Sequence, residues 1–244
     1  MTMKLNCDLG ESFGSWKMGL DSMAMRHIDQ ANIACGFHAG DPLWMTKTLA
    51  LAAENGVEVG AHPGYPDLVG FGRRSMKCSA EEIQSLVLYQ VSALDGMARS
   101  QELEMTYVKP HGALYNDMMA DEFVRSNIMQ AVASYFRPIR LVLQATPQSK
   151  IHRAEAEKLG LEVAFEAFAD RCYADDGKLL SRAEEGAVHT KEKMLAQVQQ
   201  LVDKSTVTTV SGHELTLDVD TLCVHGDNEA GVRSIEAIRE MLAK

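Results

Sequence analysis

The sequence lacks the patterns that mark membrane proteins, nucleotide motors and dehydrogenases. In its 244 residues no window approaches eighteen apolar residues, so we expect no membrane-spanning helix. It contains no G-x-x-x-x-G-K-[ST] phosphate loop, no G-x-G-x-x-G after a strand and no G-x-S-x-G elbow. We therefore do not expect a self-contained nucleotide motor, a nicotinamide enzyme or an α/β-hydrolase.

Positive charge and paired cysteines are also scarce. The formal net charge of −10 argues against a nucleic-acid partner and against an anionic membrane surface. The five cysteines are odd in number and include no C-x-x-C pair, which favours reduced thiols in a reducing compartment. The first residues, MTMKLNCDLGE, lack the apolar stretch of a signal peptide. We expect the chain to act in the cytoplasm.

Short apolar runs alternate with longer helical patterns along the whole chain. Because strands separated by helices form parallel sheets, the pattern predicts a parallel α/β fold. The seven expected strands are Lys4–Leu9, Asn32–His38, Val57–His62, Thr106–His111, Ile139–Ala145, Glu162–Phe168 and Thr221–His225. Nearly every strand ends in polar residues, which favours a barrel over an open sheet with a single crevice. We predict one β/α-barrel domain over residues 1–244, with a β-hairpin inserted near 206–219.

Several helix ends can be placed from capping residues. Asp41 followed by Pro42 is typical of a helix N-terminus, and Gly56 suits the far end of the same helix. Ser79 and Glu82 have the spacing of a capping box. These signals separate the expected strands with helices long enough to cross over a parallel sheet.

Alternation along the strands predicts where the chemistry lies. Successive side chains of a strand point to opposite faces, so Asn6 and Asp8 share one face of the first strand. Lys109 and His111 share a face of the fourth strand in the same way. At least five strands place an ionisable group near their C-terminal ends. Because an unpaired buried charge is costly, we expect these groups to converge in one functional site at the barrel mouth.

Three of the residues suit a metal or acid–base chemistry. Asp8, His38 and His62 form a donor set that suits a divalent metal ion with an open position. Without a metal, Asp8 could act as a general base on water, oriented by His62. The sequence leaves both alternatives open.

Cationic residues suggest how negative charge is handled. Lys109 and His111 would stabilise a developing oxyanion or carry protons, although Lys109 could instead be an ion-pair partner of Asp8 or Glu166. Arg73 and Arg74 follow a glycine-rich turn, a combination suited to binding a carboxylate or phosphate. Arg171 is a similar candidate.

Six blocks of sequence resemble the LamB/YcsF family, which is associated with 5-oxoprolinase. They are LNCDLGE at Leu5–Glu11, NIACGFHAGD at Asn32–Asp41, AHPGYPDLVGFGRR at Ala61–Arg74, VKPHGALYN at Val108–Asn116, EAFADRCY at Glu166–Tyr173 and CVHGDN at Cys223–Asn228. The resemblance covers nearly the whole chain. It implies an irregular seven-stranded β/α barrel of the glycoside hydrolase/deacetylase class.

The resemblance also implies an activity. The family reaction is the ATP-dependent opening of 5-oxo-L-proline to L-glutamate, with ATP as co-substrate and with two partner subunits, B and C. For this reaction we expect catalytic roles for Asp8, His62, Lys109 and His111. We expect substrate contacts from Asn6, Glu11, Asn32, Arg73, Arg74, Tyr115, Glu166, Arg171, His225 and Asp227. The competing hypotheses are a metal-dependent deacetylase or carbohydrate hydrolase, and a non-catalytic binding subunit.

Overall fold

Seven parallel strands form a closed barrel in this computed structural model, which describes residues 3–182, 184–226 and 229–243. The strands are β1 (Lys4–Leu9), β2 (Gln30–Ala34), β3 (Glu58–His62), β4 (Met105–Val108), β5 (Arg140–Gln144), β6 (Val163–Phe168) and β9 (Thr221–Val224). The last strand, β9, lies between β6 and β1 and closes the barrel. The predicted seven-stranded α/β barrel is therefore confirmed.

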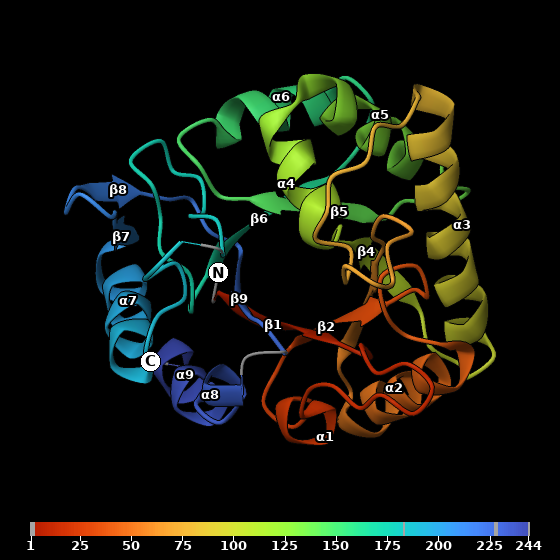
Figure 1. Cartoon of the computed structure of the whole chain (residues 1–244), viewed down its shortest axis with the longest axis horizontal. Helices are drawn as coiled ribbons and strands as arrows, with labels where there is room; N and C mark the ends of the chain where they lie inside the picture. Colours follow the sequence, from red (N-terminus) through yellow and green to blue (C-terminus); the bar gives the residue numbers. More distant parts are fainter. Residues whose placement is uncertain (1–2, 183, 227–228, 244) are drawn as a thin grey trace.

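Helices surround the barrel on its outside (Figure 1). They are α1 (Asp21–Ala24), α2 (Pro42–Asn55), α3 (Ala80–Arg99), α4 (Gly112–Ala120), α5 (Glu122–Ala133), α6 (Ser149–Glu157), α7 (Lys191–Lys204), α8 (Glu229–Val232) and α9 (Ile235–Leu242). Strands β7 (Thr206–Thr208) and β8 (Glu214–Thr216) pair antiparallel in a hairpin at the left edge of Figure 1. None of the helices in the described ranges has the length and apolar character needed to span a bilayer.

The capping signals act as the sequence predicts. The Asp41 carboxylate accepts backbone N–H bonds of 2.8 and 2.9 Å from the first turn of α2, and Gly56 ends that helix with a φ of 65°. At the start of α3, Ser79 and Glu82 form both bonds of a capping box. These caps fix where α2 and α3 begin.

Two strands end three or more residues before the predicted position. Strand β2 ends at Ala34 and not at His38, because the chain turns at Gly36, whose φ of 94° disfavours other residues. Strand β4 ends at Val108, but backbone hydrogen bonds to β3 and the residue after it continue at every second residue. Lys109 N donates to Ala61 O at 2.8 Å, and His111 N donates to Pro63 O at 2.8 Å.

A glycine on β3 makes room for an aromatic ring inside the barrel. A Cβ atom added to Gly60 would lie 2.1 Å from the ring of Tyr107, so no larger residue fits there without rearrangement. The Tyr107 hydroxyl then donates to Asn32 Oδ1 at 2.8 Å. The lack of a side chain at Gly60 therefore allows the Tyr107 ring to fill this part of the barrel interior.

We expect Gly60→Ala to lower the free energy of unfolding by about 1–3 kcal/mol, because it overpacks the barrel interior. Gly96→Ala is the matched control, since Gly96 lies within α3 with no atom near its virtual Cβ. The control should stabilise the chain by about 0.5–1 kcal/mol through helix propensity. Urea denaturation of both variants measures the difference, and equal stabilities would contradict this account of the interior.

Candidate functional site

A buried ion pair lies at the centre of the site. Lys109 Nζ is 2.8 Å from Asp8 Oδ1 and 3.1 Å from Glu166 Oε2. The same ammonium group lies 3.0 Å from Cys223 Sγ. Residues of β1 and β6 thus meet one cation that follows β4, as the alternation of the strands predicts, and Cys223 of β9 joins them.

The charges of this group stabilise one another. Burial alone would raise the pKa of Asp8, but His62 and Lys109 outweigh it and hold the pKa well below its ordinary value. Burial alone would lower the pKa of Lys109, but Asp8, Cys223 and Glu166 outweigh it and raise the pKa well above its ordinary value. Burial raises the pKa of Glu166. Asp8 is therefore an ionised carboxylate held out of bulk water.

Two amides position the ion pair. The Asn32 side chain donates to Asp8 Oδ1 and to Asn6 Oδ1, both at 2.8 Å. Asn6 in turn donates to Thr221 Oγ1 at 2.9 Å. Because each amide has partners on other strands, both are held in one orientation and fix the carboxylate of Asp8.

Two histidines next to Asp8 are held by backbone carbonyls. His62 Nδ1 lies 2.7 Å from the carbonyl oxygen of Lys109, and His111 Nε2 lies 2.8 Å from that of Phe71. Because a carbonyl oxygen only accepts hydrogen bonds, His62 Nδ1 and His111 Nε2 each carry a proton. The other nitrogens, His62 Nε2 and His111 Nδ1, face each other at 3.0 Å. His62 Nε2 also lies 3.5 Å from Asp8 Oδ2.

His38 completes the histidine cluster (His38, His62 and His111). Its ring stacks on His111 with centroids 3.6 Å apart and planes 3° from parallel. Glu11 Oε1 lies 3.5 Å from both His38 Nε2 and His111 Nδ1. Burial lowers the pKa of His38 and of His111 well below the ordinary value, so both rings are neutral.

The loop before α3 positions His111 by way of a strained residue. Phe71 adopts a φ of 54°, which is uncommon for a residue with a side chain. This conformation presents its carbonyl to His111, while Gly72 O accepts from Ala113 N at 2.9 Å. Gly112 must remain glycine, because an added Cβ would lie 2.7 Å from Gly72 O.

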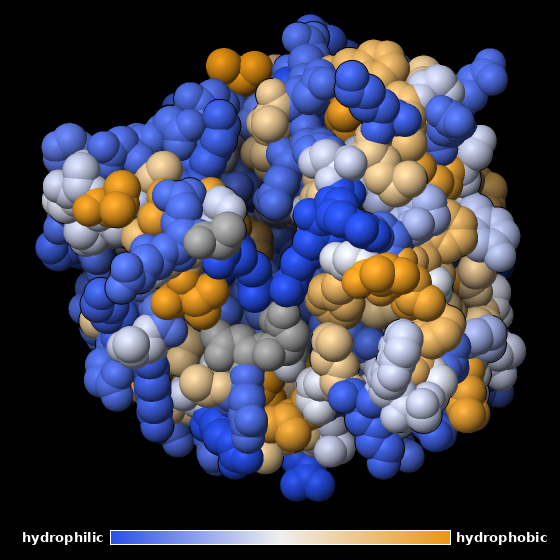
Figure 2. Space-filling view, in the orientation of Figure 1, coloured by the Kyte–Doolittle hydropathy of each residue, from blue (hydrophilic) through white to orange (hydrophobic). Residues whose placement is uncertain are grey.

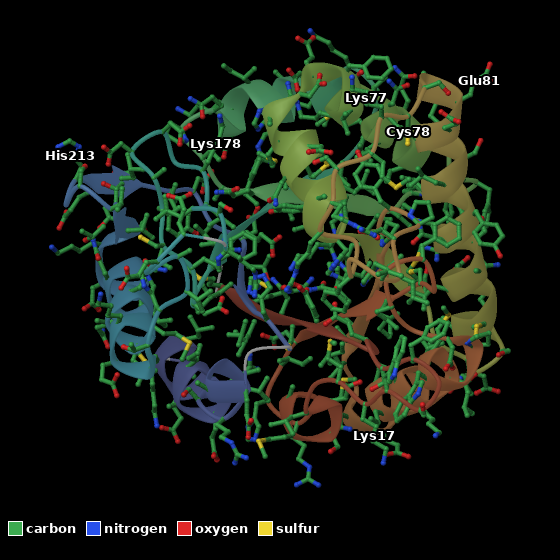
Figure 3. The ribbon with its side chains drawn as sticks, viewed as in Figure 1. Lys17, Lys77, Cys78, Glu81, Lys178 and His213 are labelled. Atoms are coloured by element: carbon green, nitrogen blue, oxygen red, sulfur yellow. The ribbon has the colours of Figure 1, made fainter. Side chains whose placement is uncertain are left out.

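A cavity of about 540 Å³ opens above this group. Its buried wall includes Asp8, His62, Lys109 and His111, and its outer wall includes Arg73, Arg171, Lys178 and Arg182. Figure 2 shows hydrophilic side chains around a hollow near the middle of the face, and Figure 3 shows Lys178 on the loop between β6 and α7. The volume suits a small molecule, and the outer cations suit an anion.

Most of the predicted substrate residues border this cavity or support it. Tyr115 and His225 line the cavity with Arg171, which is itself held by the carbonyl oxygens of Ala187 and Leu180. His225 Nδ1 lies 2.9 Å from Asp170 Oδ1. Asn6, Asn32 and Glu166 lie beneath the cavity wall as partners of the ion pair, and Glu11 lies behind the histidines.

One predicted residue does not join the site. Arg74 pairs with Asp67, its side chain is 66% exposed, and it is not part of the cavity wall. Its neighbour Arg73 lines the cavity instead, so one arginine of the pair contributes to the wall. Asp227 lies outside the described residues.

Three residues of the site are not among those predicted: Cys223, whose thiol contacts Lys109, and Lys178 and Arg182 on the outer wall. Cys223 could have been found, because it shares a strand face with His225. Lys178 and Arg182 lie on an irregular segment after β6, where no periodicity places side chains. Only the folded chain brings them to the cavity.

The fold and the site together define a β/α barrel with acid–base groups beneath an anion-binding cavity. The chain belongs to the LamB/YcsF family, whose sequence profile matches residues 3–244. It is 52% identical over 239 residues to the 5-oxoprolinase A subunit numbered 2 of Pseudomonas putida, covering 98% of this chain and 93% of that protein. It is also 52% identical to the 5-oxoprolinase A subunit of Chromohalobacter salexigens, covering 97% and 95% of the two chains.

Solved structures agree with this placement. The lactam utilization protein of Thermus thermophilus superposes with a TM-score of 0.90 at 38% identity, covering 100% of this chain and 96% of that one. A putative cellobiose-phosphate cleavage protein of Enterococcus faecalis superposes with a TM-score of 0.55 at 12% identity, covering 99% and 90% of the two chains. The second match shows a shared fold alone.

We expect Lys109→Met to lower the free energy of unfolding by about 3–5 kcal/mol, because it leaves the buried Asp8 carboxylate without its cation. Lys204→Met is the control, since Lys204 forms an exposed pair with Glu214 and should change stability by about 1 kcal/mol or less. Urea denaturation measures both. A Lys109→Met variant as stable as the control would show that Asp8 does not depend on this lysine.

Proposed function

We propose that this chain is the A subunit of an ATP-dependent 5-oxoprolinase, which opens the lactam ring of 5-oxo-L-proline to give L-glutamate. The observation that supports this most is an ionised, buried Asp8 between Lys109 and His62, at the wall of a cavity lined further out by cations. The A-subunit relatives, about half identical over nearly their whole length, supply the substrate class.

The reaction explains why ATP and partners are needed. A lactam is an amide that resonance protects against water. Transfer of the γ-phosphoryl group of ATP to the carbonyl oxygen would release ADP and leave the carbonyl carbon electrophilic. Water then adds to this carbon, the C–N bond breaks as nitrogen takes a proton, and a second water releases phosphate. Since this sequence has no phosphate loop, we assign the activation step to the partner subunits B and C.

The residues of this chain would carry out ring opening in the cytoplasm. Asp8 and His62 lie 3.5 Å apart and would take the proton of the attacking water between them. Lys109 already has partners in Asp8, Glu166 and Cys223, so it would act as a fixed positive charge near the developing oxyanion. His111 would return to the leaving nitrogen the proton that it receives at Nδ1 from His62 Nε2, 3.0 Å away.

The outer cations would hold the anionic part of the substrate. 5-Oxoproline carries a carboxylate and its activated form also carries a phosphoryl group. Arg73 is exposed on the cavity wall, and Arg171 is fixed there by two backbone carbonyls. A guanidinium group can bind either anion through two parallel hydrogen bonds. This arrangement orients the lactam carbonyl toward Asp8.

We expect Asp8→Asn to reduce glutamate formation from 5-oxoproline and ATP by about 10²–10⁴-fold in the reconstituted three-subunit enzyme, because the amide cannot accept a proton. Asp203→Asn, on the surface of α7, is the control and should retain full activity. Near-normal activity of Asp8→Asn would favour a non-catalytic binding subunit. Turnover of a substrate by this chain without ATP would favour a deacetylase or carbohydrate hydrolase.

We expect Arg73→Gln to raise KM for 5-oxoproline by about 10–100-fold with a smaller change in kcat, because one charge-assisted hydrogen bond to the substrate is lost. Arg74→Gln is the matched control, since Arg74 is the adjacent residue and pairs with Asp67 outside the cavity. Initial rates over a range of substrate concentrations measure both constants. Equal KM values for the two variants would remove Arg73 from the binding site.

A further inference from the structure

The inner nitrogens of His62 and His111, Nε2 and Nδ1, face each other 3.0 Å apart. Their outer nitrogens donate to the carbonyl oxygens of Lys109 and Phe71, so the inner nitrogens are the ones that can bind an ion. Histidines that bind a metal are usually held in this way, with the other ring nitrogen donating to a carbonyl or carboxylate oxygen. A metal ion next to both inner nitrogens would bind both of them.

His38 is a third histidine at the same place that could bind an ion. Its side chain is fully buried, and neither ring nitrogen has a hydrogen-bond partner among the described residues. The Nδ1 side is closed by the backbone, because a Cβ atom on Gly64 would lie 2.8 Å from Nδ1. The Nε2 side faces Glu11, whose Oε1 is 3.5 Å away. A buried imidazole without a hydrogen bond is costly unless it binds something else.

The distances between these groups suit a single ion. One ligand atom from each of Glu11, His38, His62 and His111 lies within 4.8 Å of all the others. Ligands bound at about 2.0–2.2 Å to one ion lie about 3–4.4 Å from each other, so small side-chain movements suffice. We propose that Glu11, His38, His62 and His111 form a binding site for one divalent transition-metal ion, of the kind that imidazole and carboxylate ligands hold together, such as Zn²⁺ or Mn²⁺.

This donor set differs from the one that the sequence suggested. Glu11 and His111 join His38 and His62, while Asp8 remains beside the site with its Oδ2 3.5 Å from His62 Nε2. His62 and His111 line the cavity, whereas Glu11 and His38 lie behind them. The ion would therefore be reachable from the cavity. With the ion bound, His62 and His111 would hold it in place of moving protons. Asp8 beside the ion would then take the proton of the attacking water, whose loss a divalent cation favours.

The test measures metal binding by the full-length chain after treatment with EDTA and dialysis. Titration calorimetry with ZnCl₂ and with MnCl₂ should give one ion per chain for at least one metal, with a higher thermal unfolding temperature when it is bound. Glu11→Gln and His38→Ala should each weaken binding at least about tenfold. His213→Ala is the control, because this exposed histidine lies on the β8 hairpin far from the barrel centre (Figure 3), and it should bind like the unaltered chain.

Absence of one-to-one binding for both metals would overturn the proposal and would mean that a shared proton joins His62 and His111. Unaltered affinity in Glu11→Gln would overturn it as well. If His38→Ala fails to fold, Glu11→Gln decides alone, because it preserves side-chain shape. Neither substrate nor partner subunits enter the measurement. Failure of the metal site therefore leaves the proposed ring opening to its own test, and failure of ring opening leaves metal binding intact.

Discussion

The site depends on one ammonium group placed between two carboxylates inside the barrel. Lys109 contacts Asp8 and Glu166, and without it these acids would face each other in a medium that screens charge poorly. Because His62 and Lys109 keep Asp8 ionised, the barrel can bury a base. The Asn32 amide adds hydrogen bonds to Asp8 and to Asn6. Without such bonds the buried polar groups would be destabilising. Stability and chemistry therefore rest on the same contact.

The backbone that carries Lys109 also orients the histidines. The Lys109 carbonyl binds His62 Nδ1, and His111 follows two residues later with its own Nε2 held by Phe71. The positive φ of Phe71 is backbone strain, and strain of this kind gathers at functional sites because the surrounding structure must impose it. A shift of this short segment would misplace the lysine and both imidazoles together. This coupling explains why the loop is fixed to the start of α4 through Ala113.

Strand alternation could predict the inner part of the site. Asn6 and Asp8 point inward as expected, and Lys109 with His111 keep the same alternation because backbone pairing continues beyond β4. His38 was expected on a strand, yet it reaches the cluster from a loop after Gly36. Arg73 and Arg74 are adjacent in sequence, and only the contact with Asp67 decides which one faces away. Such choices depend on distant contacts that no local pattern contains.

The distribution of charge relates the cavity to the rest of the molecule. The chain carries a net charge of −10, so its overall field does not attract an anion. Arg73, Arg171 and Lys178 place positive charge at the outer wall of the cavity, and its attraction reaches about one Debye length, roughly 8 Å. An anion is therefore held only when it is already close to them. Its uncharged end must then point inward to Asp8, since a second negative group there would meet an ionised carboxylate. A small molecule with an anionic end and a neutral amide satisfies both conditions.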